Sequence, residues 1–178
     1  MNMRKTIILA AFAAAMVSCM PGPSVPERFS SVADTLSAGK YFTMADLGGE
    51  DDALLVADFV YDDLEGHIAT INAHVYSTDS EGNVVDCGCV YSQGTAYPLA
   101  VRGGRLFTSG HRFIHKYCLG SDGQLETAGS VLEVLDSLGE PLRYVIDGDM
   151  VCLPGDSLEL AAYDEWAGAD ILSFSPVR

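Results

Sequence analysis

The sequence predicts a mainly β protein with a minor helical part: an antiparallel meander of about eight strands, folded as a flattened barrel or a two-layer sandwich, with one C-terminal helix. The length of 178 residues suits one domain. Hydrophobic residues make up 48% of the chain and charged residues 20%, as in a packed globular protein. Eighteen Gly and seven Pro are too many for a helical bundle but suit short strands joined by turns.

The first half of the body is expected to contain a short helix followed by two kinds of strand. Residues 31–38 form one or two helical turns, since a serine can cap them and Gly39 can end them. Residues 53–61 are almost all apolar, which is typical of a strand covered on both faces. Residues 68–76 alternate between apolar and polar positions, which indicates a strand with one face toward water.

Turn signals at short intervals predict four hairpins between residues 79 and 148. Each signal is a cluster of Gly, Asp, Asn or Ser between two apolar runs, and the last of them, Asp-Gly, favours a type I′ turn. Strands joined by such short turns must run antiparallel, which is why a meander is predicted. The four turns are placed at 79–83, 103–104, 121–123 and 147–148.

The C-terminal helix is predicted from its end signals. Asp156 followed by Glu159 has the spacing of a capping box, and Gly168 can end the helix. Residues 171–174 then form a short final strand that returns to the sheet. The apolar face of the helix is expected to consist of Leu158, Leu160, Ala161, Ala162 and Trp166.

The N-terminal residues have the layout of a secretory signal. A short basic start precedes an apolar run at 6–17, which is shorter than the about 20 residues that a membrane-spanning helix needs. Residues 16–19 read MVSC and resemble the lipobox of bacterial lipoproteins, in which the Cys is acylated and becomes the new N-terminus. Met16 departs from the pattern, because Leu is usual at that place.

This resemblance implies a signal peptide at 1–18, a lipidated Cys19 at the start of a Pro-rich linker at 19–30, and a single β-rich domain at 31–178. Two or more acyl chains make membrane attachment stable, whereas one is marginal. The prolines of the linker favour an extended stalk. We therefore expect an exported bacterial membrane lipoprotein, at the outer membrane, in the periplasm or on the cell surface, with palmitate-type acyl chains as its anchor.

The charge of the chain restricts its partners. Twenty-five acidic residues stand against ten basic ones, giving a formal net charge of −15. A nucleic-acid partner is excluded, because such binding depends on a basic footprint. Electrostatic docking on anionic lipid is disfavoured as well. The expected partners are the membrane, through the lipid anchor, and an unidentified protein, peptide or glycan.

A second resemblance lies inside the body. Residues 94–117, GTAYPLAVRGGRLFTSGHRFIHKY, resemble a stretch of uncharacterised exported β-rich lipoproteins of bacteria. The stretch is not a catalytic signature. The resemblance implies an exported β-rich module of unknown function and assigns no role to any residue.

Four cysteines follow Cys19 in the sequence, an even number in a chain predicted to be exported. Cross-strand disulfides are one hypothesis, and Cys87 and Cys89 are expected to share a strand face. The alternatives are reduced, buried thiols, a thiolate metal site, or a redox pair. The candidate disulfide residues are Cys87, Cys89, Cys118 and Cys152.

Metal and cofactor sites have little support in the sequence. His111 and His115 are four residues apart, close to a cysteine, but lack the Glu of a metalloprotease motif. Acidic clusters at 50–52 and 62–65 lack the spacing of an EF-hand, so solvated loop charge is favoured over calcium binding. Neither a phosphate-binding loop nor a dinucleotide fingerprint is present. We therefore expect no metal and no cofactor.

These observations favour a membrane-anchored envelope lipoprotein that acts as a noncatalytic binding or structural module, not as an enzyme. The alternative is an envelope hydrolase or a thiol- or metal-dependent enzyme that uses the Cys and His residues, including a Cys–His pair formed only in space, such as Cys89 or Cys118 with His111. Aromatic side chains anchor many interfaces. The candidate binding patch is Tyr91, Tyr97, Tyr144 and Trp166.

Overall fold

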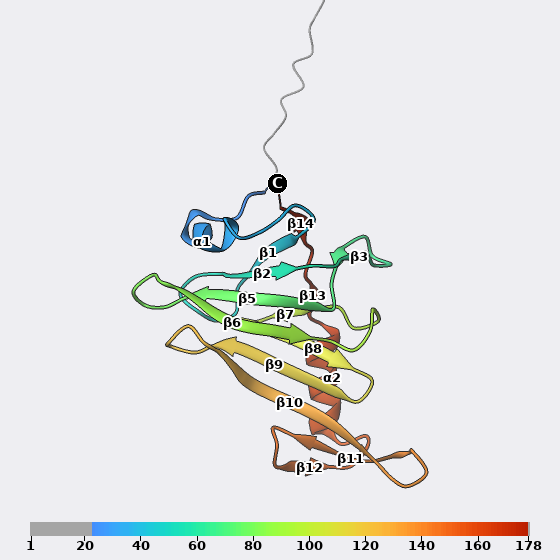
Figure 1. Cartoon of the computed structure of the whole chain (residues 1–178). Helices are drawn as coiled ribbons and strands as arrows, with labels where there is room; N and C mark the ends of the chain where they lie inside the picture. Colours follow the sequence, from blue (N-terminus) through green and yellow to red (C-terminus); the bar gives the residue numbers. More distant parts are fainter. Residues whose placement is uncertain (1–22, 178) are drawn as a thin grey trace, which may run out of the picture.

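The computed structural model describes residues 23–177. The predicted signal peptide, Cys19 and the first part of the linker lie outside the described residues. The prediction of a mainly β fold with antiparallel sheets and a C-terminal helix is confirmed, although the described chain contains fourteen strands where about eight were expected. It does not form a closed barrel, because it contains separate sheets with free edges (Figure 1).

The first sheet has five strands, all paired antiparallel, in the spatial order β14, β1, β2, β5, β6. A separate two-stranded ribbon, β3 and β4, is inserted between β2 and β5. The strands are β1 Tyr41–Ala45, β2 Ala53–Ala57, β3 Tyr61–Asp62, β4 Ile68–Ala69, β5 Asn72–Thr78, β6 Val84–Tyr91 and β14 Ser175–Pro176.

The second sheet has seven antiparallel strands in the order β12, β11, β10, β9, β8, β7, β13. All four predicted hairpins are present, one in β5–β6 and three in this sheet. The last turn has three residues, 147–149, between the register partners Ile146 and Met150, so it is one residue longer than the predicted two-residue turn, although Asp147 and Gly148 both have positive φ. The strands are β7 Ala100–Arg102, β8 Arg105–Gly110, β9 Phe113–Leu119, β10 Leu125–Leu135, β11 Pro141–Ile146, β12 Met150–Cys152 and β13 Asp170–Ile171.

Two long predicted strands are each broken by a corner. The range 53–61 becomes β2 and β3, and the range 68–76 becomes β4 and β5. Thr70, predicted to face water, is instead buried and donates its hydroxyl hydrogen bond to the Phe59 carbonyl at 2.7 Å. This hydrogen bond links the corner between β2 and β3 to the corner between β4 and β5. Both runs therefore bend at this place and do not continue as single strands.

The N-terminal segment covers the outer face of the first sheet. It contains the 3₁₀ turn η1 (Glu27–Phe29) and the short helix α1 (Ser30–Ala33). Phe29 is fully buried against Phe42 and Leu54, and Val25 packs on the same cluster. Val25 and Phe29, from the range expected to be a linker, therefore pack on the first sheet. Val177 joins this cluster, so both ends of the described chain lie at one end of the molecule (Figure 1).

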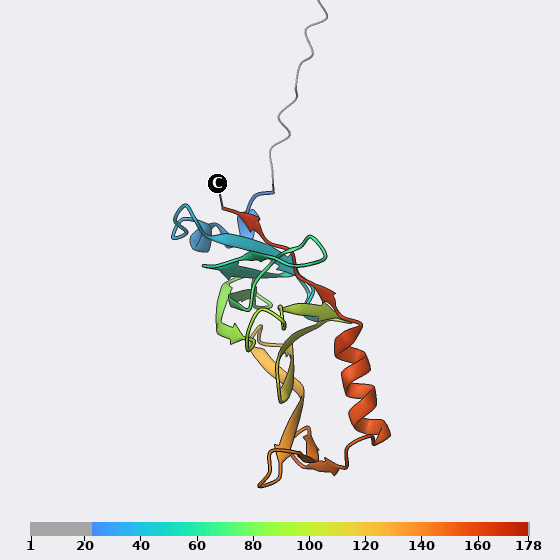
Figure 2. The same ribbon diagram turned by 90° about the vertical axis from the view of Figure 1, so that its right-hand side faces the viewer.

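The inner face of the first sheet packs against one end of the second sheet. Leu55 and Val75 of the first sheet meet Leu106 of β8, together with Leu172 and Phe174 near the C-terminus. Every residue of β2 is buried because both of its faces are covered, as the apolar run in the sequence predicted. Figure 2 shows the first sheet at the upper end of the molecule and the second sheet continuing below it, with α2 alongside.

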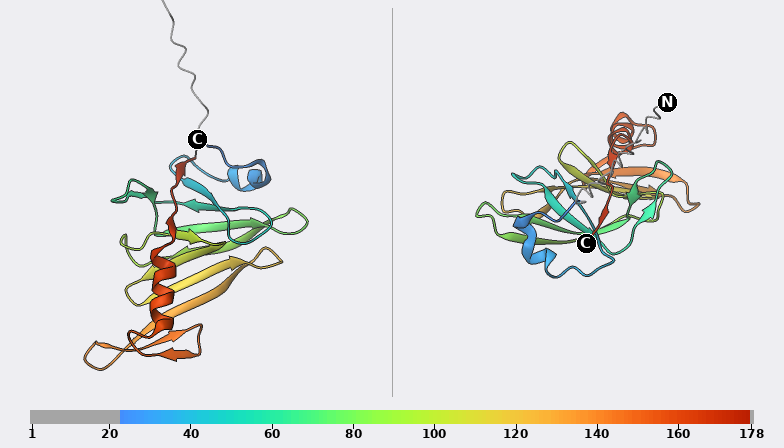
Figure 3. Two further views of the ribbon diagram at one scale, coloured as in Figure 1. Left: turned by 180° about the vertical axis from the view of Figure 1, so that it is seen from behind. Right: turned by 90° about the horizontal axis from the view of Figure 1, so that it is seen from above.

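Helix α2 (Ser157–Ala167) packs on the opposite face of the second sheet and runs across its strands (Figure 3). Asp156 caps it by accepting a hydrogen bond from the Leu158 N–H at 3.0 Å, as predicted. The expected apolar face is partly wrong, because Leu158, Leu160 and Ala161 are exposed. The residues that contact the sheet are Ala162, Tyr163, Trp166 and Ala169.

The far end of the second sheet is covered on one face only. We call residues 130–135 of β10 together with β11 and β12 the distal wing. Val131 and Ile146 point toward α2, whereas their neighbours Leu132 and Val145 point away from it. The distal wing lies at the end of the molecule opposite residues 23 and 177 (Figure 1).

Neither helix of residues 23–177 has the length and apolar character that a membrane crossing requires.

Candidate functional site

The β5–β6 hairpin contains a β-bulge that changes which side chains of β6 share a face. The pairing register shifts by one residue, and Cys87 is the extra residue. Gly88 has a φ of 78°, a left-handed conformation that favours glycine. Residues three apart on a regular strand point to opposite faces, yet Asp86 and Cys89 both lie beside His74 on the outer face.

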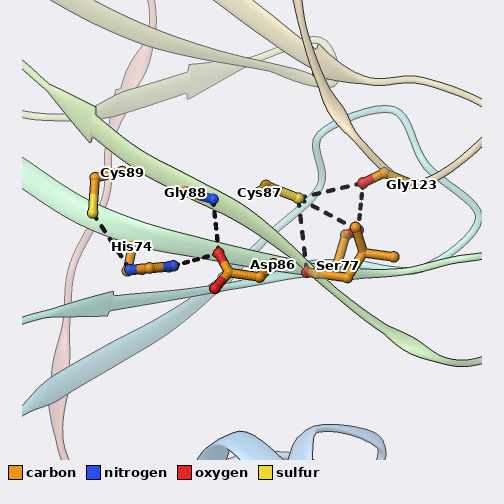
Figure 4. A network of polar contacts seen from close by, with 8 residues as sticks. His74, Ser77, Asp86, Cys87, Gly88, Cys89 and Gly123 are labelled. Atoms are coloured by element: carbon orange, nitrogen blue, oxygen red, sulfur yellow. Dashed lines mark hydrogen bonds and ion pairs between the residues drawn. The ribbon is translucent and has the colours of Figure 1, made fainter.

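Cys89, His74 and Asp86 form a row of three hydrogen-bonding groups, which we call the β6 cluster (Figure 4). The Cys89 Sγ lies 3.4 Å from His74 Nδ1, and His74 Nε2 lies 2.5 Å from Asp86 Oδ1. The Gly88 N–H donates to the same Asp86 oxygen at 2.9 Å. The hydrogen bonds from His74 and Gly88 lower the pKa of Asp86, so its carboxylate stays charged near neutral pH. Each ring nitrogen of His74 thus has a partner within the cluster, Cys89 at Nδ1 and Asp86 at Nε2.

The β6 cluster opens into a pocket of about 250 Å³ between the outer face of the first sheet and the segment that follows α1, which contributes Thr35, Leu36 and Lys40. Cys89 is exposed and His74 is half-buried. Tyr76 stacks on the His74 ring, with 4.6 Å between ring centroids and 12° between planes, which fixes the ring orientation. Lys40 and Asp58 form an ion pair at the same pocket. A reactive atom on a small molecule can thus reach the thiol.

Cys87 faces the other way from Cys89, so the expectation that the two share a face is wrong. Its Sγ lies 3.3 Å from the Gly123 carbonyl and 3.6 Å from Ser77 Oγ, inside the contact between the two sheets (Figure 4). Burial raises the pKa of the Cys87 thiol. The bulge is the physical cause, because the extra residue reverses the alternation of β6 at this point.

None of the four described cysteines is paired in the structure, so the hypothetical cross-strand disulfides are absent from it. The registers explain this. Cys89 lies opposite His74, Cys118 opposite Glu126, and Cys152 opposite Tyr144. No cysteine of residues 23–177 therefore has another as its cross-strand neighbour.

His111, His115 and the cysteines do not converge. His111 lies in the β8–β9 turn and its Nδ1 is 3.2 Å from the Tyr97 hydroxyl. His115 is half-buried between Phe113 and Tyr117, and burial lowers its pKa. Lys116, the next residue along β9, points to the opposite face of the sheet, toward α2. Cys118 lies on the same face as Lys116 and therefore on the other side of the sheet from His115. Over residues 23–177, no three His, Cys, Asp or Glu side chains are arranged to hold a metal ion.

The acidic clusters act locally. Asp63 accepts hydrogen bonds from the His67 backbone and ring, each at 2.7 Å, and these bonds help to lower its pKa against the opposing effect of desolvation. Glu50 and Asp51 line an open hollow of about 470 Å³ between loops of the two sheets. The exposed positions of Glu50 and Asp51 agree with the prediction of solvated loop charge, whereas the Asp63 side chain is only 9% exposed and is paired with His67.

The four aromatic residues of the candidate patch do not form one surface. Tyr91 is exposed and lines the pocket of the β6 cluster. Tyr97 and Trp166 meet elsewhere, with 6.0 Å between ring centroids. Tyr144 is only 7% exposed, beneath α2, and donates a hydrogen bond to Glu133 at 3.2 Å. Tyr144 was expected in an exposed patch, but the hydrophobic side chains of α2 bury its ring.

Exposed apolar side chains gather instead on the distal wing. Leu132, Val145 and Val151 are register partners across β10, β11 and β12, and we call them the wing row. Leu132 is 49% exposed and Val151 60% exposed. Further exposed apolar side chains at this end are those of Leu138, Leu142, Met150, Leu153, Leu158 and Leu160.

The sequence reasoning missed His74 and the distal wing. His74 lies in the range 68–76, whose polar positions were expected to face water, and the spatial Cys–His pair left open by the sequence involved His111 instead. The Gly between two cysteines in CGC was the available signal, since a glycine inside a strand often marks a bulge.

No family model matches the chain, and neither a curated protein nor a solved structure matches it.

Proposed function

We propose that this chain is a bacterial envelope lipoprotein, anchored through acylated Cys19, whose body is a noncatalytic binding module with the distal wing as its contact surface. The observation that carries the proposal is the wing row, whose apolar side chains are register partners on the sheet face that points away from α2, with Leu132 49% and Val151 60% exposed. Contiguous exposed apolar surface usually marks an interaction site, because leaving it in water is unfavourable.

The position of the distal wing relative to the start of the described chain supports the same proposal. The described chain begins at the end of the body where α1 and β14 lie, and the distal wing is at the other end (Figure 1). A lipid attached before residue 23 would place the wing away from the bilayer. The wing row consists of branched aliphatic side chains on a sheet face, which suits an apolar protein surface better than a glycan.

The contact surface is tested by photocrosslinking in intact bacteria that express the full chain. We expect a photoreactive residue at Val151 to give one discrete crosslinked product, and Leu132→Asp to abolish it, because a charge in the wing row opposes apolar contact. The matched control is the same photoreactive residue at Leu64, which is fully exposed in the β3–β4 ribbon. Equal crosslinking from positions 151 and 64 would overturn the proposed surface.

The anchor is tested separately. We expect the full chain to incorporate labelled palmitate and to fractionate with membranes, and Cys19→Ser to lose both properties. Cys118→Ser is the control, because it removes a thiol from the body and leaves the N-terminus unchanged. Unchanged labelling of the Cys19→Ser variant would refute the lipid anchor without bearing on the contact surface.

A further inference from the structure

We propose that Cys89 is an activated thiol that exchanges with small disulfides, with His74 as its base and Asp86 as the residue that positions His74. The inference goes beyond binding through the distal wing, since it concerns the other end of the molecule and a covalent step. It depends on the geometry of the β6 cluster and on the pocket beside it.

The geometry supplies each element that activation requires. A thiolate, and not a thiol, is the nucleophile in disulfide exchange. The His74 Nδ1, 3.4 Å from Sγ, is placed to accept the thiol proton. Because Asp86 accepts the hydrogen bond from His74 Nε2–H, the free electron pair of the neutral ring lies on Nδ1 and faces the sulfur. The charged Asp86 also stabilises the imidazolium that forms.

The reaction is balanced within the cluster and its substrate. The Cys89 proton passes to His74, and the thiolate attacks one sulfur of the disulfide. A new S–S bond forms at Cys89 while the S–S bond of the substrate breaks. The leaving thiolate takes the proton from His74 and departs as a thiol. Cys89 is thereby oxidised, the leaving sulfur is reduced, and no further oxidant is needed.

Disulfide exchange fits the cluster better than acyl transfer. Acyl transfer also requires hydrogen-bond donors aimed at a developing oxyanion, whereas exchange needs only the nucleophile and a proton donor for the leaving sulfur. The pocket volume of about 250 Å³ suits a small molecule and not a folded protein. The charged pair of Lys40 and Asp58 at this pocket suits a polar substrate, such as an amino-acid or peptide disulfide.

The product is expected to be a lasting mixed disulfide. A second thiol is needed to resolve such an adduct, and the neighbouring Cys87 lies on the opposite face of the sheet with its thiol bonded to Gly123. Cys152 is buried, and burial raises the pKa of its thiol. Cys89 thus acts as a site of reversible modification and not of a dithiol cycle.

The experiment uses the full chain with glutathione disulfide as the probe, followed by intact mass and peptide mapping. We expect one glutathione adduct per chain, located at Cys89 and released by a reductant. Cys89→Ser should prevent it, and Cys118→Ser, the matched control, should not change its rate. An adduct located at another cysteine would overturn the proposal, as would acetylation of Cys89 by p-nitrophenyl acetate without reaction with the disulfide.

The role of His74 is tested by rate. We expect His74→Gln to slow the exchange at pH 7 roughly tenfold, because an ordinary thiol is only slightly ionised there. The rate of the variant should rise more steeply with pH than that of the parent. Equal rates and equal pH profiles would refute activation by His74. The titratable and charged groups around the thiol and the imidazole are Lys40, Asp58, Tyr76 and Tyr91, which line the same pocket, and Asp86, which is hydrogen-bonded to the imidazole.

The bulge provides a test that leaves all three side chains of the cluster unchanged. Gly88→Ala strains a left-handed residue without meeting any neighbouring atom, whereas Gly88→Asn tolerates that conformation. We expect Gly88→Ala to slow the exchange and Gly88→Asn to preserve most of it, with thermal unfolding followed as a check on folding. Equal rates in the two variants and the parent would show that the bulge does not place the cluster.

Discussion

The first sheet and the distal wing are both built from short antiparallel strands, but they differ in how many of their faces are covered. All five residues of β2 are buried, between the α1 segment on one side and the second sheet on the other. In β11 and β12 the residues facing α2 are mostly buried and the others are mostly open to solvent. Buried apolar side chains are therefore concentrated at the end where the described chain begins, while the distal wing leaves apolar side chains exposed.

The largest effect is expected in the first sheet. Leu55→Ala should lower the free energy of unfolding by about 2–5 kcal/mol, because it leaves a cavity in the contact between the two sheets. Urea denaturation measures the change, and Leu132→Ala in the distal wing is the matched control. Equal losses in the two variants would remove the distinction between the regions.

Tyr144 makes the contact between α2 and the distal wing sensitive to alkaline pH. Burial, assisted by the charge of Glu133 and the hydrogen bond to it, raises the pKa of Tyr144 to about 12 from the usual 10.0. The unfolded chain loses this proton near pH 10 and the folded chain near pH 12. The stability from this group, roughly 2–3 kcal/mol, is therefore complete below pH 10 and lost as pH rises to 12.

Denaturation as a function of pH tests this assignment. We expect Tyr144→Phe to flatten the fall in stability between pH 10 and 12. Burial also raises the pKa of Tyr163, so we expect a smaller fall in stability over this pH range to remain in Tyr144→Phe. An unchanged slope in Tyr144→Phe would show that the alkaline sensitivity lies outside this contact.

The cap of α2 contributes less. Asp156→Ala should destabilise the protein by about 1 kcal/mol, because it removes the acceptor of the Leu158 N–H at the helix start. Asp156→Ser retains an acceptor and is the control. In Asp156→Ala we expect the backbone amides of α2 and the distal wing to exchange their hydrogens faster, and those of β2 to be unchanged. An equal increase in all three would show that the first sheet and the distal wing do not unfold separately.

The smallest effect is expected on the wing row. Leu132→Ser should change the free energy of unfolding by less than about 0.5 kcal/mol, because the side chain is already half exposed and packs against no helix. The same variant should still lose the crosslink from position 151. A stability loss as large as that of Leu55→Ala would mean that the wing row is structural.

The sequence predicted those parts of the fold that depend on neighbouring residues. The Asp147-Gly148 turn follows from residues that accept positive φ, and α2 follows from Asp156 at its start. The buried strand at 53–57 was predicted by its apolar run. The split of the runs at 53–61 and 68–76 was not, because the Thr70 bond to Phe59 that joins the corners links residues eleven positions apart.

The candidate sites were harder to predict, for the same reason. The four cysteines and His74 were visible in the sequence, but their partners depend on register, and one extra residue at Cys87 exchanges the faces of a strand. Tyr144 and Leu132 look alike as apolar residues of alternating strands. Only the position of α2 decides that the first is buried and the second is open.

By itself the sequence determined that this is an acidic, mainly β chain with four hairpins and a capped C-terminal helix, because turns, caps and alternation arise from interactions between residues a few positions apart. The tertiary structure alone decided which faces are covered, which cysteine meets a histidine, and where apolar surface remains. Those outcomes depend on contacts between segments far apart in the chain, whose register and packing no local pattern encodes.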